Sequence, residues 1–232
     1  MLFYGVDMVY LRVSAGLVML AIASVLDIRK REINDILWIS FGAVAVVLLV
    51  VGPEPWNELR LIAVSMIIAP IALVVWRFGF FGGADAFCLI VLAGLAPMTS
   101  LQPVQVTPLT TLTNAAIISI APFFVNLGRN LLAISGKQDI FDGFEETRLN
   151  KVVALFIGYR AKNPRHSFSM ERLVGGKKRL NFGFHHAENA EFCSTMDTWV
   201  TPGIPYIIYI ALGFVVQIIY GDLIFGFIRH II

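Results

Sequence analysis

A long stretch without any charged residue constrains this chain more than any other feature of its sequence. No Asp, Glu, Lys or Arg occurs between Ala86 and Gly128. At about 1.5 Å per residue, such a stretch is too long for one helical crossing of a hydrocarbon core about 30 Å thick. The polar, proline-containing piece Pro97–Pro103 divides it into two apolar segments. Both segments are typical of helices in a bilayer.

The composition of the whole chain supports the same conclusion. Of its 232 residues, 57% are hydrophobic and 15% are charged, whereas soluble domains are about 45–50% apolar and about 25% charged. We predict an all-α membrane fold of six transmembrane helices, with a small α+β cytoplasmic domain inserted between helices five and six. The expected spans are Met8–Leu26, Ile36–Val51, Leu61–Trp76 with a kink at Pro70, the part of the uncharged stretch before Pro97, Pro108–Ile134 and Pro202–Ile228.

The distribution of Lys and Arg predicts the orientation of the chain. If the first segment ends in the cytoplasm, fifteen of the eighteen Lys and Arg residues are cytoplasmic, and only Arg12, Arg60 and Arg229 are not. Cytoplasmic loops of membrane proteins are enriched in these residues. We therefore expect a multi-pass protein of the cell membrane whose soluble domain faces the cytoplasm.

The domain boundaries follow from the same pattern. Transmembrane helices one to five are expected within residues 1–135, the soluble domain within 136–200, and the sixth helix within 201–232. About 60 residues is a marginal size for independent stability, so we expect the soluble domain to rest on the helices or on the lipid headgroups.

Two elements are expected within the soluble domain. Apolar residues at helical spacing predict an amphipathic helix over Glu146–Lys162, which would suit a membrane surface. Ser167–Val174 and Lys177–Phe184 flank Gly175-Gly176, a pattern that indicates a β-hairpin with a two-residue turn.

Two aspartates are the strongest candidates for chemistry. Asp27 ends the first apolar segment, and Asp85 begins the fourth, directly after Gly82-Gly83-Ala84. The expected topology places both at the cytoplasmic ends of their helices. Two carboxylates at one depth can share a proton, so that one takes a proton from water while the other stabilises the oxyanion of an attacked peptide carbonyl.

Each aspartate alone has a plainer explanation as an interfacial cap. Asp27 lies beside Arg29 and Lys30, and Asp85 suits the N-cap of the helix that follows it. The two together, beside a diglycine, favour a catalytic pair. We expect the carboxylates to need a movement to meet, because ionised acids repel each other and the diglycine gives the loop freedom.

These residues resemble the GXGD aspartic peptidases, and among them the archaeal preflagellin and prepilin peptidases. Gly82–Asp85 is similar to the family motif, in which a strict GXGD has Gly where this chain has Ala84, a variant of archaeal members. Asp27–Asp35 resembles the segment that begins with the family's first catalytic aspartate, and Thr201–Pro205 resembles the start of the last helix in the archaeal branch. The similarity extends over the whole chain.

The resemblance implies an aspartic endopeptidase with Asp27 and Asp85 as its catalytic pair and with no cofactor and no metal. Its expected partners are precursors of archaellins and type IV pilin-like proteins and the membrane lipids, and not nucleic acid. Cleavage of a short basic class III signal peptide is expected after a Gly at the cytoplasmic face. The chain lacks the cysteine-rich insert of bacterial relatives, so N-methylation of the product is not expected.

Supporting roles are expected for residues around the pair. Gly82 and Gly83 permit movement of the loop or close approach of an extended substrate, or they form a tight turn. Cys88 is expected to be a small buried hydrophobe. The acidic residues that could attract a basic leader are Glu32, Asp35, Asp139, Asp142, Glu145 and Glu146.

Two further polar features have structural explanations. Asp222 is expected to pair with Arg12 or Arg229 near the outer end of the last helix. His185-His186 is expected to be a pair at the edge of the hairpin, because no third metal ligand stands at a fitting spacing.

Two other classes of function stay open at this point. A proton-coupled transporter would use Asp27, Asp85 and Asp222 as a relay, although two of these acids cluster at one face and the sequence has no inverted repeat. A structural subunit of a secretion or filament complex would use the soluble domain as a docking module. Processing of a precursor, and its loss when Asp27 or Asp85 becomes Asn, would distinguish the peptidase from both.

Overall fold

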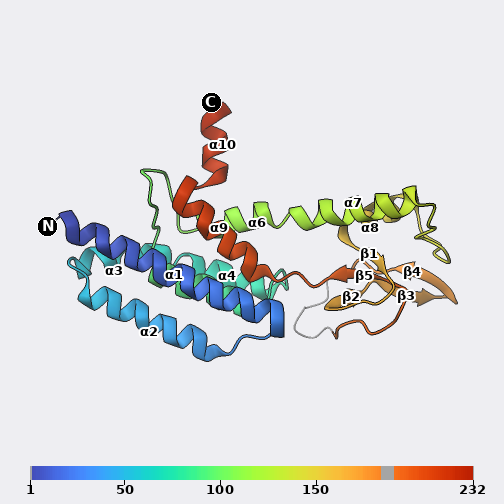
Figure 1. The fold of residues 1–232 in the computed structure, drawn as a ribbon, viewed down its shortest axis with the longest axis horizontal. Helices are drawn as coiled ribbons and strands as arrows, with labels where there is room; N and C mark the ends of the chain where they lie inside the picture. The colour runs from blue at the N-terminus through green and yellow to red at the C-terminus, as the bar shows by residue number, and fades with distance from the viewer. Residues whose placement is uncertain (1, 184–190, 232) are drawn as a thin grey trace. The chain divides into compact units, whose positions relative to one another are not determined.

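The computed structural model describes residues 2–183 and 191–231, and the chain divides into two compact units (Figure 1). The first unit comprises Met1–Ser119 and Pro205–Ile232, and the second comprises Ile120–Ile204. The first unit is helical, whereas the second contains a small sheet. The expectation of a mostly helical chain with a small sheet domain toward the C-terminus is confirmed.

The helices of the first unit follow the apolar segments of the sequence. Helices α1, α2, α4, α5 and α9 share one core, in which α5 contacts each of the other four (Figure 1). The bounds are α1 Leu2–Lys30, α2 Asp35–Val51, α3 Pro55–Ser65, α4 Ile68–Arg77, α5 Gly83–Leu95, α6 Thr110–Ile118, α9 Tyr206–Tyr220 and α10 Leu223–Ile231.

Several helices are long and apolar enough to cross a membrane. Within the described residues these are Met8–Lys30, Pro55–Arg77 and Thr110–Ser135, and the pair α9–α10, bent by 44°, makes a fourth if it counts as one span. Helices α2 and α5 are apolar but shorter. These helices indicate a membrane protein.

The third span is interrupted earlier than the sequence predicts. The helix begins at Pro55, and the break falls at Met66–Ile67, one turn before Pro70. Proline has no N–H to donate to the carbonyl four residues back, and its ring crowds that carbonyl. The N–H of Ala69 therefore bonds the Met66 oxygen instead, at 2.9 Å.

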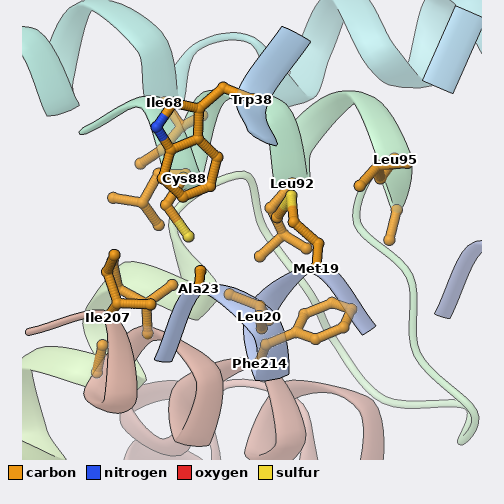
Figure 2. Close-up of a cluster of buried hydrophobic side chains, with 14 of the residues drawn as sticks. Met19, Leu20, Ala23, Trp38, Ile68, Cys88, Leu92, Leu95, Ile207 and Phe214 are labelled. Carbon is orange, nitrogen blue, oxygen red and sulfur yellow. The ribbon is translucent and has the colours of Figure 1, made fainter. Parts of the chain in front are cut away.

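The core of the first unit lies where α1, α2, α5 and α9 converge. Figure 2 shows Cys88 of α5 between Trp38 of α2 and Ala23 of α1, with Ile207 of α9 beneath. Cys88 is fully buried among these apolar side chains, so its expected role as a small buried hydrophobe is confirmed.

Helices α6 and α9 approach closely because Gly213 has no side chain. A Cβ on Gly213 would lie 2.6 Å from the Thr111 oxygen and 2.7 Å from the Ala115 nitrogen. Small residues at such contacts allow membrane helices to pack backbone against backbone.

Asp222 caps a helix rather than pairing with an arginine. Its Oδ1 accepts the N–H groups of Ile224 (2.9 Å) and Phe225 (3.2 Å) at the start of α10, and its Oδ2 accepts the Thr110 hydroxyl at 2.9 Å. The expected pairing with Arg12 is wrong, because Arg12 pairs with Glu58 at 3.2 Å. Gly221, with φ of 80°, breaks the apolar segment just before the cap.

The second unit combines short strands with two of the described helices. Strand β5 lies between β1 and β2 and is antiparallel to both, while β3 and β4 form a separate hairpin. The core includes Trp199, whose indole N–H donates to the Ile140 oxygen at 2.7 Å. The bounds are α7 Ala121–Ser135, α8 Arg148–Ile157, β1 Tyr159–Ala161, β2 Ser167–Ser169, β3 Glu171–Val174, β4 Lys177–Leu180 and β5 Thr198–Pro202.

The predicted hairpin is present with the expected turn. Gly175 and Gly176 have φ of 60° and 79°, the left-handed pair that a two-residue turn between twisted strands requires. Ser167–Val174, predicted as one strand of the hairpin, forms two strands instead. Strand β2 pairs with β5, and only β3 pairs with β4. The predicted end of the second strand at Phe184, together with His185-His186, lies outside the described residues.

Two predicted helix boundaries are wrong. The helix expected over Glu146–Lys162 ends at Ile157, because the chain extends at Gly158 and Tyr159–Ala161 then pairs with β5. The last helix, expected from Pro202, begins at Tyr206, because Thr198–Pro202 forms β5. Sheet pairing thus includes residues 159–161 and Pro202, which the sequence predicts to be helical, and residues 203–205 connect β5 to α9.

Candidate active site

Asp27 lies in the last turn of α1 and is half-buried. The helix ends at Lys30, and Arg31 then takes a left-handed conformation with φ of 57°. Arg29 and Lys30 suit this position, because cations near a helix C-terminus interact favourably with the helix dipole. The basic run after Asp27 therefore ends the helix and leaves the carboxylate near its terminus.

Asp85 lies at the opposite kind of helix end, in the first turn of α5. It is the third helical residue, and its Oδ2 accepts the N–H of Gly82, the N-cap residue, at 2.9 Å. Only 8% of Asp85 is exposed. Asp85 thus serves the helix terminus, as the plainer explanation of the sequence suggests, although from the third position and not as the N-cap itself.

The glycines before Asp85 form the turn into α5. Gly79 has φ of 79°, whereas Gly82 has φ of −81° and ψ of 167°. A Cβ on Gly82 would lie 3.6 Å from the Asp85 Oδ2, which is an ordinary contact distance. The left-handed position in this loop is therefore Gly79, and Gly82 contributes its N–H to Asp85.

The two carboxylates belong to the same unit and lie close enough to interact electrostatically. Helices α1 and α5 are in direct contact. Both carboxylates also interact electrostatically with Cys88, one turn after Asp85 on the buried side of α5. The structure therefore brings together the two residues that the sequence selects.

The first turn of α9 completes this site, and the sequence analysis did not identify it. The N–H of Ile207 is a hydrogen-bond partner of the Asp27 carboxylate. The ring of Tyr206 stacks on Phe81, with 5.6 Å between the centroids, and Tyr206 interacts electrostatically with Asp85. The available signal was Pro205, because proline often precedes or opens a helix whose first N–H groups are free to bind an anion.

The other acidic candidates are distributed over both units. Glu32 and Asp35 are exposed at the α1–α2 connection, whereas Asp139 and Asp142 are exposed in the second unit. Glu145 pairs with Lys177 at 2.6 Å. The Glu146 carboxylate accepts the N–H of Leu180 and the amide of Asn150, both at 2.6 Å, so it is engaged within the second unit.

Comparison with known proteins identifies the family of this site. A model of the type IV leader peptidase family matches residues 14–125, which include both aspartates. A model of the archaeal peptidase A24 C-terminus, type II, matches residues 159–223, which include the start of α9. The chain belongs to the type IV leader peptidase family. It is a protease, and the resemblance seen in the sequence is confirmed.

Curated relatives agree over nearly the whole chain. A preflagellin peptidase of Methanococcus maripaludis is 29% identical over 92% of this chain and 96% of its own length. A preflagellin peptidase of Methanocaldococcus jannaschii is 26% identical over 91% and 94%, and one of Methanococcus voltae is 24% identical over 92% and 96%. The match therefore includes both units of this leader peptidase family member.

Proposed function

We propose that this chain is an intramembrane aspartic endopeptidase that removes short basic leader peptides from archaellin or type IV pilin-like precursors. The observation that carries the proposal is that Asp27, in the last turn of α1, and Asp85, in the first turn of α5, lie close enough to interact electrostatically, in a chain of the type IV leader peptidase family. The names of the three relatives support archaellin precursors as substrates.

The proposed reaction divides the chemistry between the two carboxylates. Asp27 is half-exposed and Asp85 is buried, so water reaches Asp27 more readily. Asp27 takes a proton from this water, whose oxygen attacks the scissile carbonyl, while the protonated Asp85 donates a hydrogen bond to the developing oxyanion. Proton transfer to the leaving amine then releases the shortened product.

The length of α5 supports a site that holds water within the membrane. Its 13 residues extend about 20 Å, less than the roughly 30 Å of a hydrocarbon core. A helix of this length needs its flanking residues, such as the non-helical residues 79–82, to complete a crossing. Irregular backbone at membrane depth requires cover by protein or a water-filled cavity, and Phe81 in this loop is buried.

The proposed topology has six crossings, with both carboxylates at the cytoplasmic face. Helices α2 and α5 would cross together with their flanking residues, beside the four longer segments. Most Lys and Arg residues then face the cytoplasm, in agreement with the positive-inside rule. The basic leader of a precursor stays on this side, where Glu32, Asp35, Asp139 and Asp142 are candidates to attract it.

Asp222 weighs against the transporter alternative. A proton relay within the membrane needs an acid that is free to exchange its proton. Both oxygens of Asp222 instead accept hydrogen bonds, one from N–H groups in the first turn of α10 and the other from the Thr110 hydroxyl. In the proposed peptidase, Asp222 has this structural role.

Co-expression with a pilin-like precursor tests the proposal. We expect a shortened product in membranes with the wild-type chain, and no product with Asp27→Asn or Asp85→Asn. Glu54→Gln, which neutralises an exposed acid between α2 and α3, is the matched control and should leave processing intact. Normal processing by either Asn variant would refute the catalytic pair, whereas failure of the wild-type chain on every leader-bearing precursor would refute the substrate class.

A further inference from the structure

Helix α8 has apolar side chains on two sides. Ala154, Leu155 and Ile157 pack against the core of the second unit. Leu149, Val152 and Val153, at positions i, i+3 and i+4, lie on the other side and are 71%, 51% and 38% exposed. A surface helix of a soluble domain keeps its apolar stripe toward the core and is polar outside, so the exposed apolar side of α8 is unusual.

Two buried asparagines of α7 fix α8 in this orientation. The Asn126 amide donates to the Phe156 oxygen at 3.1 Å, and the Asn130 amide donates to the oxygens of Leu155 (2.9 Å) and Gly158 (2.8 Å). Carbonyls at a helix C-terminus lack partners within the helix, so these bonds replace hydration. Helix α8 therefore stays beside α7 and cannot turn Leu149, Val152 and Val153 inward without breaking these three hydrogen bonds.

Helix α7 is the second half of the candidate membrane span Thr110–Ser135. It also exposes large apolar side chains in its last turns, including Leu131, Leu132 and Ile134. Helix α8 packs along α7 within the second unit, so it lies beside the last part of this candidate span. Membrane spans end at the boundary between acyl chains and headgroups.

Basic groups accompany the apolar face. Arg148 is exposed at the first residue of α8, and the Lys151 ammonium lies 5.3 Å from the centre of the Phe141 ring. On α7, Arg129 is exposed, with its guanidinium 4.1 Å from the centre of the Tyr159 ring. Long cationic side chains beside an apolar face are typical of helices that lie in an anionic membrane surface.

We propose that α8 is an interfacial helix that docks the second unit onto a bilayer containing anionic lipid. Leu149, Val152 and Val153 enter the upper acyl region, and Arg148 and Arg129 contact lipid phosphates. A second copy of the chain and the apolar helix of a precursor are alternative occupants of this face, and the experiment below distinguishes them. The proposal does not depend on the catalytic pair.

Site-specific fluorescence on the full chain in liposomes tests this docking. In a Cys193→Ser background, a fluorophore is attached at Val152→Cys or, as the control, at Arg172→Cys on the β3–β4 hairpin. Both positions are exposed, and Cys88 is buried and stays unlabelled. Lipids with a nitroxide near the headgroup should quench the probe at 152 at least about twofold more than the probe at 172.

The lipid arms separate an anionic surface from apolar contact alone. Quenching at 152 should be greater in vesicles containing phosphatidylglycerol than in vesicles of phosphatidylcholine alone, and Arg148→Gln should reduce that difference. Equal quenching of the two probes by lipid, or equal access of aqueous iodide to both, would overturn the proposal. Quenching that requires a second labelled copy, or shielding that requires added precursor, would also overturn it in favour of those occupants.

Discussion

The guanidinium of Arg12 on α1 donates to the carbonyl of Leu95, at the C-terminal end of α5, at 3.0 Å. The same guanidinium forms an ion pair with Glu58 of α3. Helices α1 and α5 thus interact at both ends, through the Arg12 hydrogen bond at one and through the electrostatic interaction of Asp27 and Asp85 at the other. Removing the Arg12 guanidinium, which binds the C-terminal end of α5, should therefore lower the stability of the unit and disturb the alignment of Asp27 and Asp85.

Arg12→Gln should lower the free energy of unfolding by about 3 kcal/mol, because loss of one member of a buried pair leaves the other without a partner. Processing of a precursor should fall as well. Thermal unfolding in detergent measures the first effect. The matched variants are Glu58→Gln and Arg12→Gln/Glu58→Gln, and the double variant should cost less than the sum of the two single variants. Strict additivity would mean that the pair does not couple α1 to α3.

Alanine at Gly213 and alanine at Gly42 should change the stability of the first unit in opposite directions. Gly213→Ala should destabilise the first unit by about 1–3 kcal/mol, because the new methyl group overlaps the backbone of α6. Gly42→Ala, in the middle of α2 with no atom within 4 Å of the new methyl, should stabilise by roughly 0.5–1 kcal/mol through the lower entropy of the unfolded chain. A scan of unfolding temperature checks both, and equal shifts would contradict the close α6–α9 contact.

The proximity of Asp27 and Asp85 could be predicted from the sequence, because Asp27 ends one long apolar segment and Asp85 begins another, and charge and glycine mark these two boundaries. A helix terminus is a local property, and local pattern reveals it. The contribution of Tyr206 and Ile207 could not be predicted in this way. Both are ordinary apolar or aromatic residues of a helix far along the chain, and only tertiary packing of α9 against α1 and α5 brings Ile207 to Asp27 and Tyr206 to Asp85.

Sheet pairing accounts for the wrong boundaries. Residues 159–161 continue the apolar pattern of α8, yet they pair with β5, whose sequence lies about forty residues away. A Cβ at Gly158 would lie 2.4 Å from the Met170 sulfur and 2.6 Å from the Val200 oxygen, so this glycine marks a close approach between distant segments. Periodicity within a window carries no information on such a partner.

Glu146 should make the second unit sensitive to acid. Burial acts to raise the pKa of Glu146, but hydrogen bonds from Asn150 and Leu180 outweigh it and hold the pKa below its ordinary value of 4.5. A carboxyl with a lowered pKa in the folded state contributes stability above its unfolded pKa, and this contribution is lost as the pH falls through the folded value. The sensitive range therefore lies below pH 4.5.

Glu146→Gln should remove that sensitivity. Hydrogen exchange of the Leu180 amide, compared at each pH, should be slower in the wild type than in Glu146→Gln near pH 6, and the difference should shrink below pH 4.5. Glu191→Gln, which neutralises an exposed acid of the same unit, is the control and should match the wild type throughout. A difference between wild type and Glu146→Gln that does not shrink as the pH falls below 4.5 would contradict the assignment.

Chelators should leave the processing of precursors unchanged. Two carboxylates that share a proton activate water by proton transfer alone, so the proposed reaction does not require a Lewis acid. The check is a processing assay in membranes with and without EDTA. Excess Mg²⁺ or Zn²⁺ is then added to the EDTA-treated preparation, and processing is measured again. Inhibition by EDTA that either ion reverses would indicate a metallopeptidase and refute the aspartic mechanism.

The hydrogen bond from Ile207 to Asp27 gives the most specific test of the role of α9. Proline is tolerated in the first turn of a helix, where it removes an N–H without breaking the helix. Ile207→Pro should therefore keep α9 but withdraw the donor from Asp27. A hydrogen bond to a charged group contributes about 1.5–3 kcal/mol, which corresponds to a loss of roughly 10- to 100-fold in the rate of processing.

The change in side-chain volume at this buried position needs its own control. Ile207→Ala leaves the N–H in place but creates a larger cavity, with a loss of about 2–5 kcal/mol in stability. If the N–H orients Asp27, Ile207→Pro should process more slowly than Ile207→Ala at a temperature where both remain folded. Faster processing by Ile207→Pro than by Ile207→Ala would mean that packing of the Ile207 side chain, and not its backbone, supports the catalytic aspartate.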